Sequence, residues 1–410
     1  MLKMIWYEWK KIWGSRLTQL AVTGCVVFLI FCTYSSITQI SARDKNGELF
    51  YGMGAAQAMR ETQEETALTQ ERVDELVGRY LAYTKDPATG SDNKDYEYLS
   101  EEIYKTFYLP NRELLNLIES TYAFGSDKSM KEIFEENEGR DFGEARLNRD
   151  RSYIKTREEL GELTSKEAGY WEERIENIPV LRYGYHKGWS MILDTTSWFI
   201  LIMTVICVGI APVFAGEYQS KCDSLVLCMK YGKSKLALAK ITAAWLYTTC
   251  VYWGITLAYS LAYLGLLGTD GRELPIQLKY PTSPILYDLT MGEAVLLFLI
   301  LEYVLTLGLM GFTLFMSAVL KSSYGVIILS FLSIIVPTFL STEAGDYAWR
   351  HILSLLPAKA ADFGFYSCIT YHIGGTVLSW PAMAILVNGA AAAVCLLLSY
   401  GIFRGHQVNK

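Results

Sequence analysis

The sequence predicts an all-α polytopic membrane protein, with six transmembrane helices, an N-terminal amphipathic helix at the membrane interface and an α-helical extracellular domain between the first and second spans. Three observations predict this fold class. Of the 410 residues, 51% are hydrophobic. Apolar stretches of about 20 residues, the length that crosses a bilayer core as a helix, recur six times. Residues 41–190 hold 52 of the 80 charged residues, so the remaining 260 positions hold only 28.

The uneven charge divides the chain into parts. Residues 41–190 carry 21 Lys/Arg and 31 Asp/Glu, which is typical of a water-exposed domain. We therefore expect an interfacial helix at 1–17, a first transmembrane helix at 18–40, an extracellular domain at 41–188 and a transmembrane domain with five further spans at 189–410. The net charge of −6 gives no indication of a nucleic-acid partner.

The first 17 residues have the pattern of an amphipathic helix. At 100° per residue, one face gathers an apolar set that includes three tryptophans, whereas Lys3, Lys10 and Lys11 lie off that face. A basic helix of this kind lies in the membrane interface. We predict that Trp6, Trp9 and Trp13 anchor it in membrane lipid; a simple aromatic anchor with a positive flank is the plainer interpretation.

The six predicted spans are residues 18–40, 189–215, 241–268, 291–320, 324–342 and 380–403. With the N-terminus in the cytoplasm, the short inner segments carry 12 basic residues and the short outer loops 4. Because basic residues concentrate on the cytoplasmic side, both termini are predicted to be cytoplasmic, in a multi-pass protein of the plasma membrane.

The polar domain is predicted to be helical. Stretches 57–83, 95–124 and 141–178 are rich in Glu, Arg, Leu and Ala, and helix-breaking residues stand near Pro87, Pro110 and Gly139. These features favour a helical hairpin or a small bundle whose mixed charges face solvent.

A nucleotide-binding loop is suggested by Gly232-Lys233-Ser234 but is not completed. The phosphate-binding motif needs a glycine five positions before Gly232, and Leu227 stands there. The sequence therefore predicts no ATP site, no metal site and no cofactor of its own, and no catalytic motif appears in the spans.

The segment around this tripeptide, residues 217–232, has a helical apolar face made of Tyr218, Cys222, Leu225, Val226 and Met229. Such a helix between two spans can be held by a protein partner. Alternatively it rests on lipid, with Lys230, Lys233, Lys235 and Lys240 attracted to an anionic inner leaflet.

Several local sequences resemble the permease subunits of type-two ABC exporters. The segment opens with Phe214-Ala215-Gly216-Glu217 and closes with Gly232-Lys233-Ser234, aliphatic residues and Lys240, although Lys221-Cys222-Asp223-Ser224 stands where a Gly-Thr pair is common. Leu355-Leu356-Pro357 and the nearly uncharged stretch 363–379 resemble the family's re-entrant outer helices, expected here within 343–379. The resemblance covers the membrane domain and leaves out residues 41–190.

The resemblance implies a function and its partners. Residues 217–232 would be a coupling segment, with Glu217 and the apolar face docking into a separate cytoplasmic ABC ATPase that binds ATP and Mg²⁺. Six spans would form half of a transporter, so a second permease copy or a paralogue would complete a dimer. The substrate would be hydrophobic or amphipathic, such as a peptide, a lipid or a drug.

Glu302 stands about eleven residues into the fourth predicted span, where a carboxylate is costly in lipid. It should therefore face the bundle or a wet cavity, as part of the translocation path, as a dimer contact or in an internal hydrogen bond. The main alternative for the whole chain is a membrane receptor or scaffold whose extracellular domain senses a ligand and whose cytoplasmic loop signals to a partner. An intramembrane enzyme is disfavoured because paired catalytic groups are missing from the spans.

Overall fold

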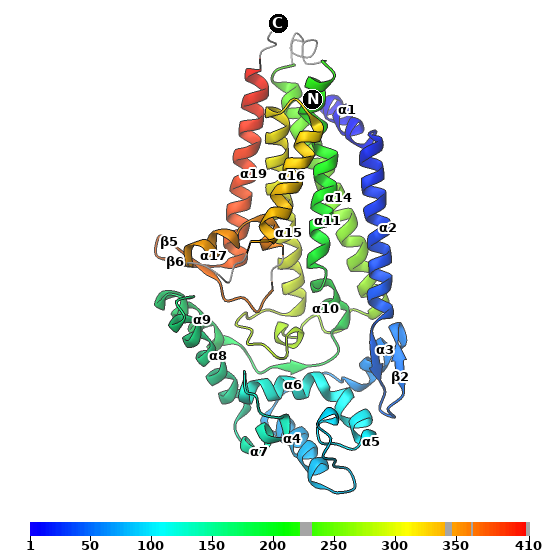
Figure 1. Ribbon diagram of the computed structural model, residues 1–410, viewed down its shortest axis with the longest axis vertical. Helices are drawn as coiled ribbons and strands as arrows, with labels where there is room; N and C mark the ends of the chain where they lie inside the picture. Colours follow the sequence, from blue (N-terminus) through cyan, green and yellow to red (C-terminus); the bar gives the residue numbers. More distant parts are fainter. Residues whose placement is uncertain (222–231, 341–346, 362–363, 407–410) are drawn as a thin grey trace.

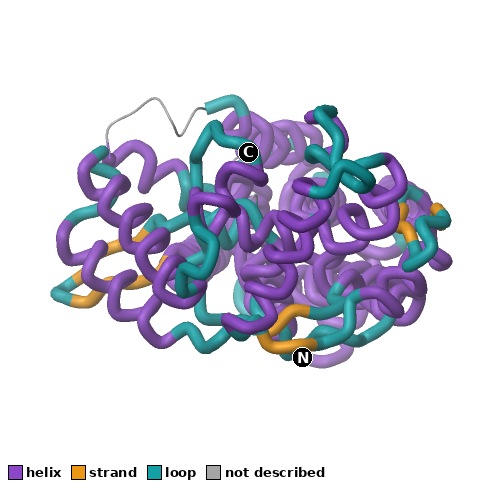
Figure 2. The backbone as a smooth tube through the Cα atoms, turned by 90° about the horizontal axis from the view of Figure 1, so that it is seen from below, coloured by secondary structure: helices purple, strands orange, loops and turns teal. Residues whose placement is uncertain are grey.

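The computed structural model describes residues 1–221, 232–340, 347–361 and 364–406. The chain is mostly helical and consists of a bundle of long helices with a separate domain, residues 41–186, at one end (Figure 1). The N-terminus and the end of the last helix lie together at the opposite end of the bundle. Figure 2 views the molecule from the end that carries the separate domain. The short strands, drawn in orange, lie toward the edges of this view.

Five helical stretches in the described residues are long and apolar enough to cross a membrane, which makes this a multi-pass membrane protein. They are α2 (Arg16–Thr38), α11 with α12 (Thr196–Ile210 and Pro212–Gln219), α14 (Lys235–Leu267), α15 (Met291–Val319) and α19 (Trp380–Gly405).

The fifth predicted span, 324–342, corresponds to a shorter apolar helix, α16 (Ser323–Thr338), of 16 residues. At 1.5 Å per residue it extends about 24 Å, less than the roughly 30 Å of a hydrocarbon core. Pro337 stands in the last turn of this helix. Proline has no backbone N–H, so it cannot donate a helical hydrogen bond there. The prediction of six full-length spans is therefore replaced by five long helices and one shorter one, with residues 341–342 outside the described part.

Three predicted spans agree with α2, α15 and α19 to within two residues at each end. The second was placed too early, because residues 189–193 belong to a separate helix, α10 (Lys187–Leu193), and the long helix starts at Thr196. Asp194 at the break pairs with Lys279, which holds this corner at the end of the bundle next to the separate domain. The third was placed too late, since α14 already begins at Lys235.

The central helix α15 packs closely on α19. A Cβ added to Gly308 would lie 3.1 Å from Asn388 Oδ1, and one added to Gly311 would lie 3.0 Å from the backbone of Ala392. Small residues at such positions let two helix backbones approach each other in a membrane. The same pair of glycines therefore fixes the α15–α19 contact.

Helix α2 contacts the bundle through one stripe only. Its buried residues in the membrane are Cys25, Leu29, Thr33 and Ile37, spaced four apart, and they face α11 and α14. Most other side chains of α2 are exposed apolar groups, among them Phe28 and Phe31. This helix is the least embedded of the five.

Helix α1 (Leu2–Trp13) lies at the end of the bundle against α14 (Figure 1). Ile12 is buried, and Trp13 meets Tyr247 edge to face at 5.3 Å. Trp9 is half-buried, whereas Trp6 is exposed and stacks on Trp9 at 5.3 Å. The predicted apolar face therefore packs largely on protein, and lipid anchoring by Trp6, Trp9 and Trp13 stays a prediction.

The separate domain has more and shorter elements than the three helices predicted. The stretch 57–83 is broken between α3 and α4 by a strand, and 141–178 is broken between α8 and α9 at Gly161, whose φ of 72° ends the helix. Helices of the domain are α3 (Gly52–Thr62), α4 (Gln70–Lys85), α5 (Glu101–Ile103), α6 (Leu109–Ala123), α7 (Met130–Glu136), α8 (Phe142–Glu159) and α9 (Ser165–Asn177), with a 3-10 turn η1 (Lys94–Tyr96) and a π-helical turn η2 (Tyr104–Tyr108). Its strands are the antiparallel pairs β1 (Ser41–Arg43) with β2 (Leu49–Tyr51) and β3 (Thr66–Ala67) with β4 (Arg182–Tyr183).

The stretch 363–379, expected to form re-entrant helices, contains instead a β-hairpin within its described part. Strands β5 (Thr370–Ile373) and β6 (Thr376–Ser379) are joined by Gly374-Gly375, whose φ values of 56° and 94° suit a tight two-residue turn. Two short helices, α17 (Tyr347–Leu353) and α18 (Pro357–Ala360), precede it, and η3 (Ile276–Lys279) lies in the other outer loop.

This outer region carries the separate domain. Trp171 of α9 is fully buried and donates through Nε1 to the Cys368 carbonyl at 2.9 Å. Tyr347 Oη donates to Glu167 at 2.9 Å. The domain is therefore fixed to the loops of the membrane bundle as well as to the helices that flank it in the chain.

Candidate functional site

A cluster of charged side chains lies inside the bundle, at the end opposite the separate domain, where α1, α12 and α14 meet. Lys240 of α14 is fully buried, and its Nζ lies 2.9 Å from Glu217 Oε1 of α12 and 2.7 Å from Glu8 Oε2 of α1. The same ammonium donates to the Val213 carbonyl at 3.1 Å. Lys11 of α1 forms a second ion pair with Glu217. We call Glu8, Lys11, Glu217 and Lys240 the charge cluster.

The charge cluster is balanced, with two cations and two carboxylates. The side chains of Glu217 and Glu8 are 7% and 16% exposed, whereas that of Lys11 is 59% exposed. Moving ions out of water costs several kcal/mol each, and this cost is offset only where partners satisfy them closely. The Lys240 ammonium meets that condition, because it has three protons and donates to three acceptors.

The charge cluster brackets the predicted coupling segment. Glu217 stands near the end of α12, which finishes at Gln219, and Lys240 stands in the second turn of α14, which begins at Lys235. Both ends of the intervening segment are thus held to one another and to α1. The alternative in which Lys240 attracts anionic lipid is wrong for this residue, because its ammonium is enclosed by protein.

The predicted docking face is only partly described. Tyr218 is buried and packs against the end of α19, with its ring centroid 6.4 Å from that of Phe403 and 4.6 Å from that of His406. Cys222, Leu225, Val226 and Met229 lie outside the described residues. Their role in coupling, together with those of Glu217 and Tyr218, stays a prediction.

Glu302 lies on α15 with no exposed surface and so faces the bundle interior, as its cost in lipid requires. Tyr252 of α14 packs beside this part of α15, with its ring centroid 5.2 Å from that of Tyr303. Tyr252 itself donates to the Leu299 carbonyl at 2.7 Å, one turn before Glu302. In this conformation the carboxylate does not reach the surface. Its role in a translocation path, a dimer contact or an internal hydrogen bond stays a prediction.

A large apolar groove lies between α2 and α14 on the side of the bundle. Its volume is about 830 Å³ and its lining is almost entirely hydrophobic. Trp13 lies at one end and Tyr51 of the separate domain at the other, with Val26, Ile30 and Ala258 between them. A groove between two membrane-spanning helices is accessible to lipid chains and to apolar molecules dissolved in the bilayer.

The part of the chain that the structure describes holds no group of three or more His, Cys, Asp or Glu side chains placed to bind a metal ion. Comparisons with protein-family models, with curated proteins and with solved structures gave no match. The resemblance to ABC permeases therefore rests on the sequence features alone.

Sequence reasoning missed the charge cluster, although two signals pointed to it. Glu8 borders the apolar face of α1 at 100° per residue, so a helix packed on that face brings Glu8 to the contact. Glu217 and Lys240 stand at the inner ends of two consecutive spans, and helices joined by a short connection tend to be neighbours. What the sequence does not indicate is that α1 packs on α14, which brings all four side chains together.

Proposed function

We propose that this chain is the membrane-spanning permease subunit of an ATP-driven ABC exporter. It forms the translocation path for a hydrophobic or amphipathic substrate and couples to a separate cytoplasmic ATPase, working as a homodimer or with a paralogue. Both termini and the segment between α12 and α14 lie on the cytoplasmic side, and the separate domain lies outside.

The observation that carries the proposal is the charge cluster. A loop that only rests on lipid has no need for buried ion pairs at both of its ends. Here Glu217 and Lys240 join the two ends, and Glu8 and Lys11 tie them to α1. A displacement of the segment by a partner is therefore transmitted directly to α12, α14 and α1, which continue into the membrane bundle. The apolar groove between α2 and α14 supports a substrate that enters from the bilayer.

The test is capture of the ATPase by the full-length chain. Purified from its native membranes, the chain should carry an ABC ATPase subunit, and the complex should hydrolyse ATP, whereas the chain alone should bind no nucleotide. Val226→Glu or Leu225→Glu should abolish capture, because an unpaired charge in an interface core costs several kcal/mol, enough to lose a micromolar contact.

Lys233→Ala is the matched control in the same segment. It should leave capture intact, whereas a true phosphate-binding loop would lose ATP binding with this change. If both glutamate variants still capture the ATPase, the docking role is wrong and the segment is a lipid contact instead. ATP bound by the isolated chain would overturn the proposal that a separate subunit binds the nucleotide. A signalling protein bound in place of an ATPase would overturn the proposed function in favour of a receptor or scaffold.

A further inference from the structure

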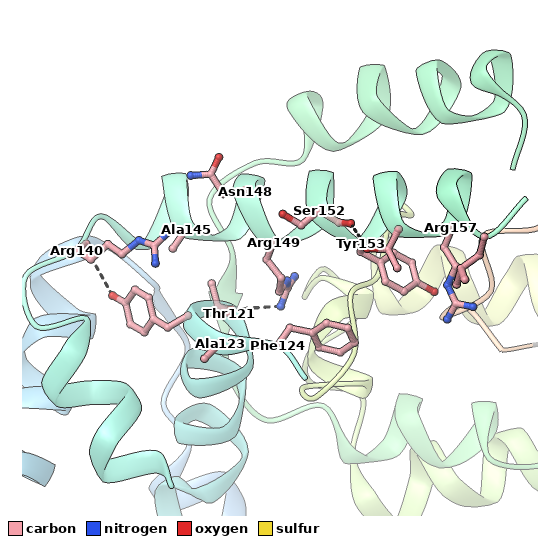
Figure 3. Close-up of a pocket in the computed structure, with 13 residues that line it drawn as sticks. Thr121, Ala123, Phe124, Arg140, Ala145, Asn148, Arg149, Ser152, Tyr153 and Arg157 are labelled. Atoms are coloured by element: carbon pink, nitrogen blue, oxygen red, sulfur yellow. Dashed lines mark hydrogen bonds between the residues drawn. The ribbon is translucent and has the colours of Figure 1, made fainter. Parts of the chain in front are cut away.

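Three cavities follow one another from the separate domain to the membrane helices. The first, of about 500 Å³, lies between α6 and α8 (Figure 3). The second, of about 530 Å³, shares Tyr153 and Arg157 with the first and reaches the outer region of the bundle. The third, of about 230 Å³, shares Lys359 with the second and lies between the outer ends of α11 and α16.

The first cavity has cations that are already satisfied. Arg149 donates to Asp150 Oδ1 at 2.8 Å and to Thr121 Oγ1 at 3.3 Å, and Figure 3 shows its guanidinium turned toward Thr121. Arg140 donates to Asn137 Oδ1 at 2.9 Å. The Asn137 acceptor is neutral, so of the cations that line only this cavity, Arg149 has a carboxylate partner and Arg140 does not.

The second cavity differs, because its described lining holds three cations and one carboxylate. Glu162 accepts from Arg157 at 2.7 Å and pairs with Arg350 at 3.0 Å, so a single negative charge is shared by two guanidinium groups. Lys359 Nζ donates to the Thr338 carbonyl at 3.3 Å, a neutral acceptor. The side chains of Arg157, Arg350 and Glu162 are 35%, 18% and 24% exposed, so this excess positive charge lies in a partly enclosed space.

The third cavity continues from Lys359 into an apolar crevice. Ala358 and Ala361 of the α18 region and Ile200 of α11 line it, together with Thr196, Ser197 and Thr338. Trp380, at the start of α19, lines the second cavity and donates through Nε1 to the Ser354 carbonyl at 3.0 Å. A tryptophan and a lysine beside an apolar crevice are typical of the level at which lipid headgroups meet acyl chains.

We propose that the second and third cavities bind an anionic phospholipid of the outer leaflet. The phosphate lies among Arg157, Arg350 and Lys359, and the first part of an acyl chain enters the crevice between α11 and α16. Guanidinium groups bind phosphate oxygens through paired donors, and the lysine adds a point charge. A free phosphate ion would meet the same cations but leave the crevice unused. This inference rests on the orientation given under the proposed function, with the separate domain outside, but it does not depend on export.

The test is lipid binding by the full-length chain, purified in detergent and freed of lipid. The probes are phosphatidylglycerol, phosphatidylcholine with the same chains, soluble glycerol phosphate and inorganic phosphate. Phosphatidylglycerol should bind at least tenfold more tightly than the other three. Lys359→Glu should weaken its binding by about ten- to hundredfold, the range for a lost charge-assisted contact. Lys155→Glu, an exposed position of α8 outside the cavities, should leave it unchanged.

A second variant tests the crevice. Ser197 is exposed at the outer end of α11, so Ser197→Trp fills the crevice from its edge without disturbing the core. This variant should weaken the binding of the long-chain lipid and leave the binding of glycerol phosphate unchanged. The proposal is overturned if phosphatidylcholine binds equally well, or if Lys359→Glu and Lys155→Glu behave alike. Inorganic phosphate binding as tightly as the lipid would instead identify a free-anion site, which also overturns it.

Discussion

Replacing Lys240 by methionine tests the charge cluster most directly. The substitution keeps the length and volume of the side chain but removes the cation that lies 2.7 Å from Glu8 and 2.9 Å from Glu217. The charge cluster then has two carboxylates, Glu8 and Glu217, and one cation, Lys11, whose side chain is 59% exposed. Removing one partner of a buried ion pair costs about 3–5 kcal/mol, mainly because the remaining charge stays buried without compensation.

Two further variants turn this magnitude into a comparison. Lys11→Met removes a largely exposed cation, and such pairs contribute at most about 1 kcal/mol. The triple variant Lys240→Met, Glu217→Gln, Glu8→Gln removes the buried charges together. It should recover most of the lost stability, since replacing a whole buried ionic group by uncharged residues of similar volume is often nearly neutral.

The assay is equilibrium unfolding of the detergent-solubilised chain, followed by the fluorescence of its 10 tryptophans, which include Trp9 and Trp13 of α1. The expected order of stability is wild type, then Lys11→Met and the triple variant close behind, then Lys240→Met well below. A free energy of unfolding for Lys240→Met within 1 kcal/mol of wild type would refute the reasoning. So would a triple variant no more stable than the single one.

Two other predictions follow from packing and from pH. Gly209→Ala should destabilise the chain by about 1–3 kcal/mol, because a Cβ there would lie 2.4 Å from the buried Tyr247 Oη; Gly265→Ala, with open space around it, should be neutral or slightly stabilising in the same unfolding assay. Burial and the nearby Glu97 raise the pKa of Glu119 in α6 to about 7. The unfolded chain therefore loses this proton near pH 4.5 and the folded chain only near pH 7, so the domain should become less stable between these values as pH rises. Hydrogen exchange of α6, corrected for its intrinsic pH dependence, should show this trend in the wild type and a flatter one in Glu119→Gln; an unchanged trend in that variant would exclude Glu119 as its source.

The sequence predicts this fold where a single local signal decides the structure. Met291 and Trp380 mark the starts of α15 and α19 because a long, mainly apolar run begins there, and a helix satisfies the backbone hydrogen bonds of such a run in lipid. The start of α11 was misplaced because hydrophobicity continues through Trp189, whereas the helix is broken by the pairing of Asp194 with a lysine 85 residues away. Distant partners of this kind leave no local signal.

The same limit applies to the sites. The position of Glu302 in an apolar run was enough to predict that it faces inward, because the cost of a carboxylate in lipid does not depend on which neighbour it meets. The charge cluster depends on the packing of α1 against α14, and the cationic cavity on the docking of α8 against the region of α17 and α18. Residues 157, 350 and 359 come from two chain segments whose approach no periodicity predicts.

The single buried stripe of α2 has a consequence for biogenesis. About 158 residues separate the end of α2 from the start of α11, and at 5–20 residues per second their synthesis takes about 8–30 s. During that interval α2 stands in the bilayer before α11 and α14, the two bundle helices that it will contact, have been made. Its exposed apolar side chains suit it to lipid on nearly all sides, and Thr33 satisfies its own hydroxyl by donating to the Leu29 carbonyl one turn earlier, at 2.9 Å. Helix α2 is thus able to persist without these two partners in the membrane while the large domain that follows it is synthesised and folds.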